Sequence, residues 1–214
     1  MLDLYEAKPE DKREPWAAMI DKVLEQAGER PRRELHGAYH VRPKEKFVTQ
    51  QQDEEIVLLL RSHPITNLGW ILMAIVMMLI PTFFEAMGMF SGIPVRFMFV
   101  AKMTWYLVTW AFAFERFLNW YYSIFIVTNE RVVDVDFYNL MSRVVTHISL
   151  NHIEEPVMGQ QGFGATMFNY GYVLVQTAGS KSTVECKACP WPAKVVDIIN
   201  RLAEELETRR TKGE

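Results

Sequence analysis

The chain has 214 residues, a formal net charge of −3 at pH 7 and hydrophobic side chains at 50% of its positions. This length accommodates one domain, or a small domain together with membrane spans. The charge is strongly segregated, because residues 65–123 contain only five charged side chains, Glu85, Arg96, Lys102, Glu115 and Arg116. A single soluble domain is therefore disfavoured.

Residues 1–45 are predicted to form an N-terminal extension with one amphipathic helix. In the stretch EPWAAMIDKVLEQAGE, one helical face collects Trp16, Met19, Ile20, Val23, Leu24 and Ala27. Gly28 is a plausible end of this helix. Because the helix is acidic on balance, we expect it to pack on the rest of the protein or on a partner rather than on an anionic bilayer. The basic cluster that follows, Arg30, Arg32 and Arg33, is typical of solvated charge, and we expect no nucleic-acid partner.

A juxtamembrane segment, residues 46–64, leads into a predicted transmembrane hairpin over residues 65–122. Its spans, about 65–87 and about 97–120, reach the roughly 20 residues that a bilayer core demands. We expect Lys102, Glu115 and Arg116, which lie near the ends of the second span, to reach the lipid headgroups. The first span begins too far from the N-terminus to be a signal peptide.

The connector MGMFSGIP between the spans is too short to be a domain, so both termini are predicted on the same side of the membrane. Basic residues flank the hairpin at Lys44, Lys46, Arg61, Arg116 and Arg131, whereas Arg96 and Lys102 are the only ones near the connector. This distribution favours both termini in the cytoplasm.

After the hairpin, the pattern changes to short β-branched segments separated by turns. In ERVVDVDFYN, Val133, Val135 and Phe137 alternate with Asp134 and Asp136, which predicts a strand with the aspartates on a solvent-exposed face. Four further segments have the same character: RVVTHISL, IEEPVMGQ, GYVLVQTA and STVECKA. The stretch after them predicts an amphipathic helix with Pro192 in its first turn.

We therefore predict an α+β domain over residues 123–207, in which this helix caps a small antiparallel β-sandwich or barrel. Residues 208–214 form a polar tail.

Three stretches of the chain carry a family resemblance: DEEIVLLLRSHPITNLGWIL, IVTNERVVDVDFYNLMSRVVTHISLNHIEEP and FGATMFNYGYVLVQTAG. Within them lie four patterns. From Glu54 to His63 an acidic residue is followed by an apolar run, and a turn between two strands spans Thr128 to Arg131. Ile148, Leu150 and Ile153 mark the junction between two strands, and a hairpin bounded by glycines runs from Gly171 to Gly179. In this order the stretches resemble the bacterial pleckstrin-homology-like (PH-like) family of membrane proteins, in which a domain of unknown function follows a two-span hairpin.

The resemblance covers roughly residues 46–206 and leaves the N-terminal extension unaccounted for. It implies a PH-like fold, with two orthogonal sheets capped by a C-terminal helix, in a protein of the bacterial cytoplasmic (inner) membrane. It transfers no catalytic residues.

Few motifs for chemistry are present. Cys186 and Cys189 form a lone CxxC that lacks a second ligand pair for structural zinc, and His147 and His152 lie across a strand and a turn. The cysteines therefore admit three interpretations: thiols without special chemistry, a redox or disulfide pair, or metal ligands. Because no catalytic motif appears, we expect no enzymatic activity, cofactor or metal.

Two sets of residues are candidates for binding. The loop Gln160–Gly171 places the apolar side chains of Phe163, Met167, Phe168 and Tyr170 where they could cover an open end of the sheet, enter the bilayer interface or contact a neighbouring subunit. Lipid headgroups would need a basic cluster, for which the candidates are Arg131, Arg143, Lys181 and Lys187, although residues 124–214 are net acidic.

The function we expect is non-enzymatic. The cytoplasmic domain would serve protein assembly, as a scaffold, as a homo-oligomer or with a membrane-protein partner. The alternatives are a domain that senses lipid headgroups and an accessory subunit of a membrane transport or redox complex.

Overall fold

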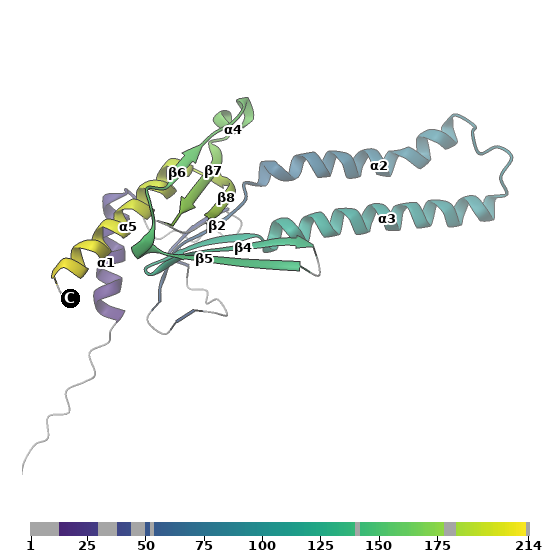
Figure 1. Cartoon of the computed structure of the whole chain (residues 1–214). Helices are drawn as coiled ribbons and strands as arrows, with labels where there is room; N and C mark the ends of the chain where they lie inside the picture. The colour runs from purple at the N-terminus through teal and green to yellow at the C-terminus, as the bar shows by residue number, and fades with distance from the viewer. Residues whose placement is uncertain are drawn as a thin grey trace, which may run out of the picture.

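The computed structural model describes residues 13–29, 38–43, 50–51, 54–139, 142–177 and 183–212. It contains two antiparallel sheets, helices packed against them and a long pair of helices that extends away from the sheets (Figure 1). The predicted α+β class is confirmed.

Among the described residues, the first sheet has five strands in chain order: β1 (Tyr39–Val41), β2 (Ile56–Arg61), β3 (Ile124–Thr128), β4 (Arg131–Asn139) and β5 (Ser142–Ser149). The neighbouring strands β2 and β3 are antiparallel, and Arg61 lies opposite Ile124. The long helical pair is thus inserted between two paired strands. The sheet also takes in β1 and β2 from the segments before the hairpin, whereas the sequence predicts a domain that begins at residue 123.

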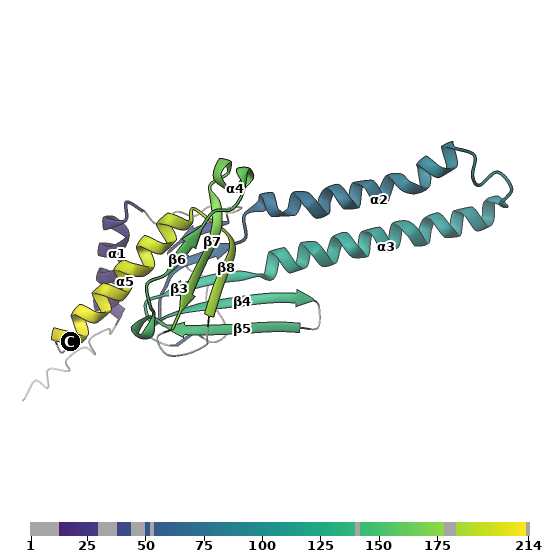
Figure 2. The same ribbon diagram turned by 45° about the horizontal axis from the view of Figure 1, so that its top comes forward.

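The inserted pair consists of α2 (Leu68–Ala86), preceded by the short 3-10 helix η1 (Pro64–Asn67), and α3 (Val95–Tyr122). The two helices run side by side (Figures 1 and 2), and the indole Nε1 of Trp105 donates a hydrogen bond to the carbonyl oxygen of Met77 at 2.7 Å. Lys102 forms an ion pair with Glu85. The two helices therefore neutralise these charges between themselves.

The second sheet, as far as the structure describes it, contains β6 (Val157–Gly159), β7 (Tyr170–Gln176) and β8 (Thr183–Pro190). The 3-10 helix η2 (Leu150–His152) lies between the sheets in the chain, and the short helix α4 (Phe163–Met167) lies between β6 and β7. The last helix, α5 (Pro192–Lys212), begins with a proline, which needs no N–H partner at that position. This confirms the predicted order of short strands followed by a helix.

The main core joins the sheets to α1 (Arg13–Gln26) and α5. Helix α1 lies at the end of the domain away from the helical pair, and α5 runs from β8 toward that end (Figures 1 and 2). The apolar face of α1 is buried there, and Lys22 of α1 pairs with Glu205 of α5 at 2.8 Å. Gly28, with a φ of 70°, ends α1 in the left-handed conformation that favours glycine. The predicted helix thus packs on the rest of the protein.

A second apolar cluster lies on the opposite face of the first sheet. It contains Ile56, Leu59, Ile126, Val133 and Val135. Both faces of β4 are therefore lined by buried side chains.

Candidate functional site

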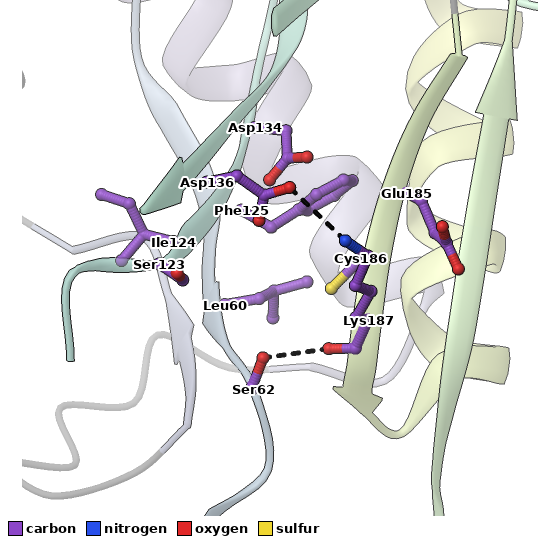
Figure 3. Close-up of a pocket in the computed structure, with 10 residues that line it drawn as sticks. All are labelled: Leu60, Ser62, Ser123, Ile124, Phe125, Asp134, Asp136, Glu185, Cys186 and Lys187. Atoms are coloured by element: carbon purple, nitrogen blue, oxygen red, sulfur yellow. Dashed lines mark hydrogen bonds and ion pairs between the residues drawn. The ribbon is translucent and has the colours of Figure 1, made fainter. Parts of the chain in front are cut away.

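A cavity of about 150 Å³ lies between the two sheets beside the root of the helical pair (Figure 3). Strands β2, β3 and β4 form one wall and β8 forms the other, and Ser62 and Ser123, which adjoin the two ends of the helical insertion, line it as well. Sites for small molecules typically enclose roughly 300–1,000 Å³. This space is therefore small for a metabolite.

The acidic side chains Asp134 and Asp136 line this cavity (Figure 3). Asp134 lies opposite Phe125, and Phe125 lies opposite Leu60, so the three side chains share the inner face of the sheet. The prediction that these aspartates lie on a solvent-exposed face of the strand is wrong, because they line the cavity between the two sheets. The alternation along β4 is real, but the outer face carries the second apolar cluster, and the aspartates point inward.

The cavity is lined by three acidic side chains, Asp134, Asp136 and Glu185, and by one basic side chain, Lys187. Lys187 Nζ lies 3.6 Å from Asp136 Oδ2, and the Ser62 hydroxyl donates a hydrogen bond to the Lys187 carbonyl oxygen at 3.1 Å. Burial raises the pKa of Asp134 to about 7, repulsion from Asp136 and Glu185 adds to this increase, and Lys187 opposes it. Asp134 can therefore exchange a proton near neutral pH.

The two cysteines lie on β8 and are both buried, and Cys186 lines this cavity. A hydrogen bond with Cys189, burial, and the proximity of Cys189, Asp134 and Asp136 raise the pKa of the Cys186 thiol well above its usual range. A protonated thiol is a poor nucleophile and a poor metal ligand. Within the described ranges, no three His, Cys, Asp or Glu side chains are grouped so that they could hold a metal ion.

A buried ion pair between Glu54 and Arg131 lies at the other end of β4. Arg131 Nε donates to Glu54 Oε1 and Nη2 to Oε2, both at 2.9 Å, and the Thr128 hydroxyl donates to Oε1 at 2.8 Å. The Glu54 side chain has 0% exposed surface. The turn between β3 and β4 is thereby tied to the segment before β2. In the sequence, Glu54 and the turn residues belong to separate motifs, and nothing in either motif indicates that they pair.

The structure does not bring the candidate lipid-headgroup residues Arg131 and Lys187 together. Arg131 binds Glu54 and Lys187 pairs with Asp136. Arg131 and Asp136 are separated by roughly 16 Å along β4, at the usual rise per residue of a strand. Lys181 and the side chain of Arg143 lie outside the described residues.

The candidate interface residues lie in and around α4. Phe163, Met167 and Phe168 are 84%, 66% and 44% exposed. Tyr170 is half-buried at the start of β7, and its ring stacks on that of His63 with 5.4 Å between centroids. The first three residues thus form an exposed apolar group, and Tyr170 lies between this group and the root of α2.

The chain matches no family model and no curated protein. Among solved structures, it is similar to a DUF1696 family protein with a pleckstrin-homology domain from Shewanella loihica PV-4. The match has 19% sequence identity and a TM-score of 0.27, and it covers 38% of this chain and 68% of that protein.

Proposed function

We propose that this is a non-enzymatic integral membrane protein of the bacterial cytoplasmic membrane, whose PH-like domain serves protein assembly on the cytoplasmic side. The observation that carries the proposal is the insertion of α2 and α3 between the paired strands β2 and β3. A domain anchored through both strands at once is held in a restricted orientation, and such a domain suits assembly with neighbours in the same membrane.

The helical pair has the dimensions and surface expected of membrane spans. The two apolar helices cover 23 and 28 residues, Pro64–Ala86 and Val95–Tyr122. At 1.5 Å per residue they are about 35 and 42 Å long, against a hydrocarbon core of about 30 Å. Only 11% and 6% of their most apolar stretches are buried in the protein, whereas a core helix of a soluble protein would be mostly buried.

The junction between the domain and the helices supports a rigid attachment. Only Ser123 separates α3 from β3. The indole Nε1 of Trp120 donates to the Ser62 carbonyl oxygen at 2.8 Å, and the Arg61 guanidinium lies 4.6 Å from the centre of the Tyr121 ring. These two contacts hold the end of α3 against the end of β2.

The order of elements in the domain supports the PH-like assignment. Strands β1–β5 form one sheet, β6–β8 form a second sheet, and α5 follows them. This is the plan of two sheets and a capping helix that the family resemblance implies, with the hairpin placed inside the first sheet.

The edge strand β5 supports a role in assembly. Within the part of the chain that the structure describes, β5 pairs with β4 alone. It exposes Val144 and Val145, and Arg143 near its start is the only Asp, Glu, Lys or Arg in the strand, whereas such charges usually protect an edge from pairing. The strand runs in the same direction as the helical pair (Figures 1 and 2), so an added strand would come from a molecule beside it in the membrane.

Site-specific photo-crosslinking in native membranes tests this proposal. A photoreactive amino acid at Val145 should give a covalent adduct, whose mass distinguishes a second copy from another protein. The same amino acid at Val157, an exposed valine on β6, is the matched control. Assembly through β5 is contradicted if position 145 gives no more adduct than position 157.

A further inference from the structure

The connection between β6 and β7 ends in an exposed apolar tip, residues 160–169, which we call the α4 tip. Its most exposed side chain, Phe163, keeps 84% of its surface accessible, and Met167 keeps 66%. Isolated surface hydrophobics are common, but adjacent large ones indicate a contact surface.

The α4 tip is fixed next to the start of α2. The Tyr170 ring stacks on His63, and His63 directly precedes η1. The His63 N–H donates to the Ala188 carbonyl oxygen at 2.8 Å, and a Cβ placed on Gly164 would lie 3.6 Å from the Tyr170 hydroxyl. Both views place α4 on the side of the domain from which α2 departs (Figures 1 and 2).

A tight strand pair supports the tip. A Cβ on Gly171 would lie 2.3 Å from the Gly159 carbonyl oxygen, so the two backbones approach closely only because Gly171 has no side chain. Gln160 Nε2 also donates to Asn169 Oδ1 at 3.0 Å across the base. The position of the tip relative to α2 is therefore set by the fold.

The tip is uncharged. Residues 157–176 contain no Asp, Glu, Lys or Arg. When the apolar side chains of the tip enter a bilayer interface, no charged side chain of this stretch has to be buried with them. It also gains nothing from anionic headgroups, since the tip offers them no cation.

We propose that the α4 tip is a third membrane-contacting element, which places Phe163, Met167 and Phe168 at the boundary between headgroups and acyl chains beside α2. The bound surface is the lipid itself, independent of its charge. This inference rests on the proposed membrane hairpin, because the start of α2 defines the level of the bilayer surface.

Fluorescence quenching by nitroxide-labelled lipids tests the inference in the full-length protein in nanodiscs. The probe is an NBD fluorophore on Gln161→Cys, an exposed position within the tip. Leu72→Cys on α2 and Asn200→Cys in the middle of α5, both exposed, report a membrane span and the surface of the domain. We expect position 161 to be quenched at least about half as strongly as position 72, as for a segment at the headgroup boundary, and position 200 to remain unquenched.

The double substitution Phe163→Ser with Met167→Ser should reduce quenching at position 161 to the level of position 200, in neutral and anionic nanodiscs alike. Both replaced side chains are exposed, so the variant should keep its fold. Quenching at position 72 without quenching at 161 overturns the α4 inference and leaves the hairpin proposal standing. No quenching at position 72 overturns both, and quenching at 161 only in anionic nanodiscs overturns the neutral-surface inference.

Discussion

The guanidinium group of Arg131 donates two hydrogen bonds to the carboxylate of Glu54, from Nε to Oε1 and from Nη2 to Oε2, each at 2.9 Å. Burial raises the pKa of Glu54, but hydrogen bonds from Arg131, the Gln51 backbone and Thr128 outweigh it and hold the pKa below its ordinary value of 4.5. A depressed folded-state pKa means that this carboxylate stabilises the fold above pH 4.5, and that the stability is lost as pH falls below that value.

Glu54→Gln should therefore destabilise the protein at pH 7 by about 3–5 kcal/mol, because it leaves the Arg131 charge without its partner. Thermal and denaturant unfolding in detergent would measure the loss. The matched control is Glu205→Gln, which breaks the solvent-exposed pair with Lys22 and should cost at most about 1 kcal/mol. Equal losses for the two variants would refute a structural role for the buried pair.

Two leucines allow the protein core to be compared with the predicted lipid-facing surface, because one lies in each. Leu60 on β2 is 0% exposed and Leu72 on α2 is 54% exposed. Leu60→Ala should cost about 2–5 kcal/mol through lost burial and a residual cavity. Leu72→Ala should leave the unfolding temperature of the domain nearly unchanged, and a large drop for Leu72→Ala would show that α2 packs against protein there.

From the raised pKa of Asp134 we predict an unusual dependence of the stability of the fold on pH. Its pKa is raised from 3.8 to about 7 in the folded state, chiefly by burial. Its contribution to stability is therefore complete below about pH 4 and declines as pH rises to about 7.

Asp134→Asn, which mimics the protonated carboxyl group, should thus raise the melting temperature most at pH 8 and least near pH 4. Glu204→Gln on the exposed face of α5 serves as the control and should show no such trend. An equal effect of Asp134→Asn at both pH values would argue against the raised pKa.

Two glycines in the second sheet and its connection differ in the space around them. An added Cβ on Gly171 meets backbone at 2.3 Å, whereas one on Gly164 reaches only the Tyr170 hydroxyl at 3.6 Å, an ordinary contact. Gly171→Ala should force β6 and β7 apart and lower the melting temperature, and Gly164→Ala should be tolerated. Comparable melting temperatures for the two variants would be inconsistent with the close approach of these strands.

Local patterns predicted much of the fold. The apolar stripe of α1, the alternation along β4 and β7, and Pro192 at the start of α5 each follow from residues within one element. The turn from Thr128 to Arg131, which the sequence analysis singles out, joins β3 to β4.

Features that depend on distant parts of the chain were not predictable in the same way. The run IVLLLR of β2 is indistinguishable from the approach to a membrane span, and its partner β3 follows only after both long helices. The alternation in β4 gives the period of the strand but not which face meets the other sheet. The pair Glu54–Arg131 and the cavity around Asp134 arise from the same non-local pairing.

Labelling of single cysteines with a membrane-impermeant maleimide tests most directly whether the inserted helices cross the membrane. The positions are Ser91→Cys in the connector and Asn200→Cys on α5, both exposed, and the buried Cys186 and Cys189 should remain unlabelled in the folded parent protein. We predict that Ser91→Cys reacts from the outside of spheroplasts and that Asn200→Cys reacts only after the membrane is opened. Reaction of both positions from the same side would contradict a membrane-spanning hairpin with a cytoplasmic domain.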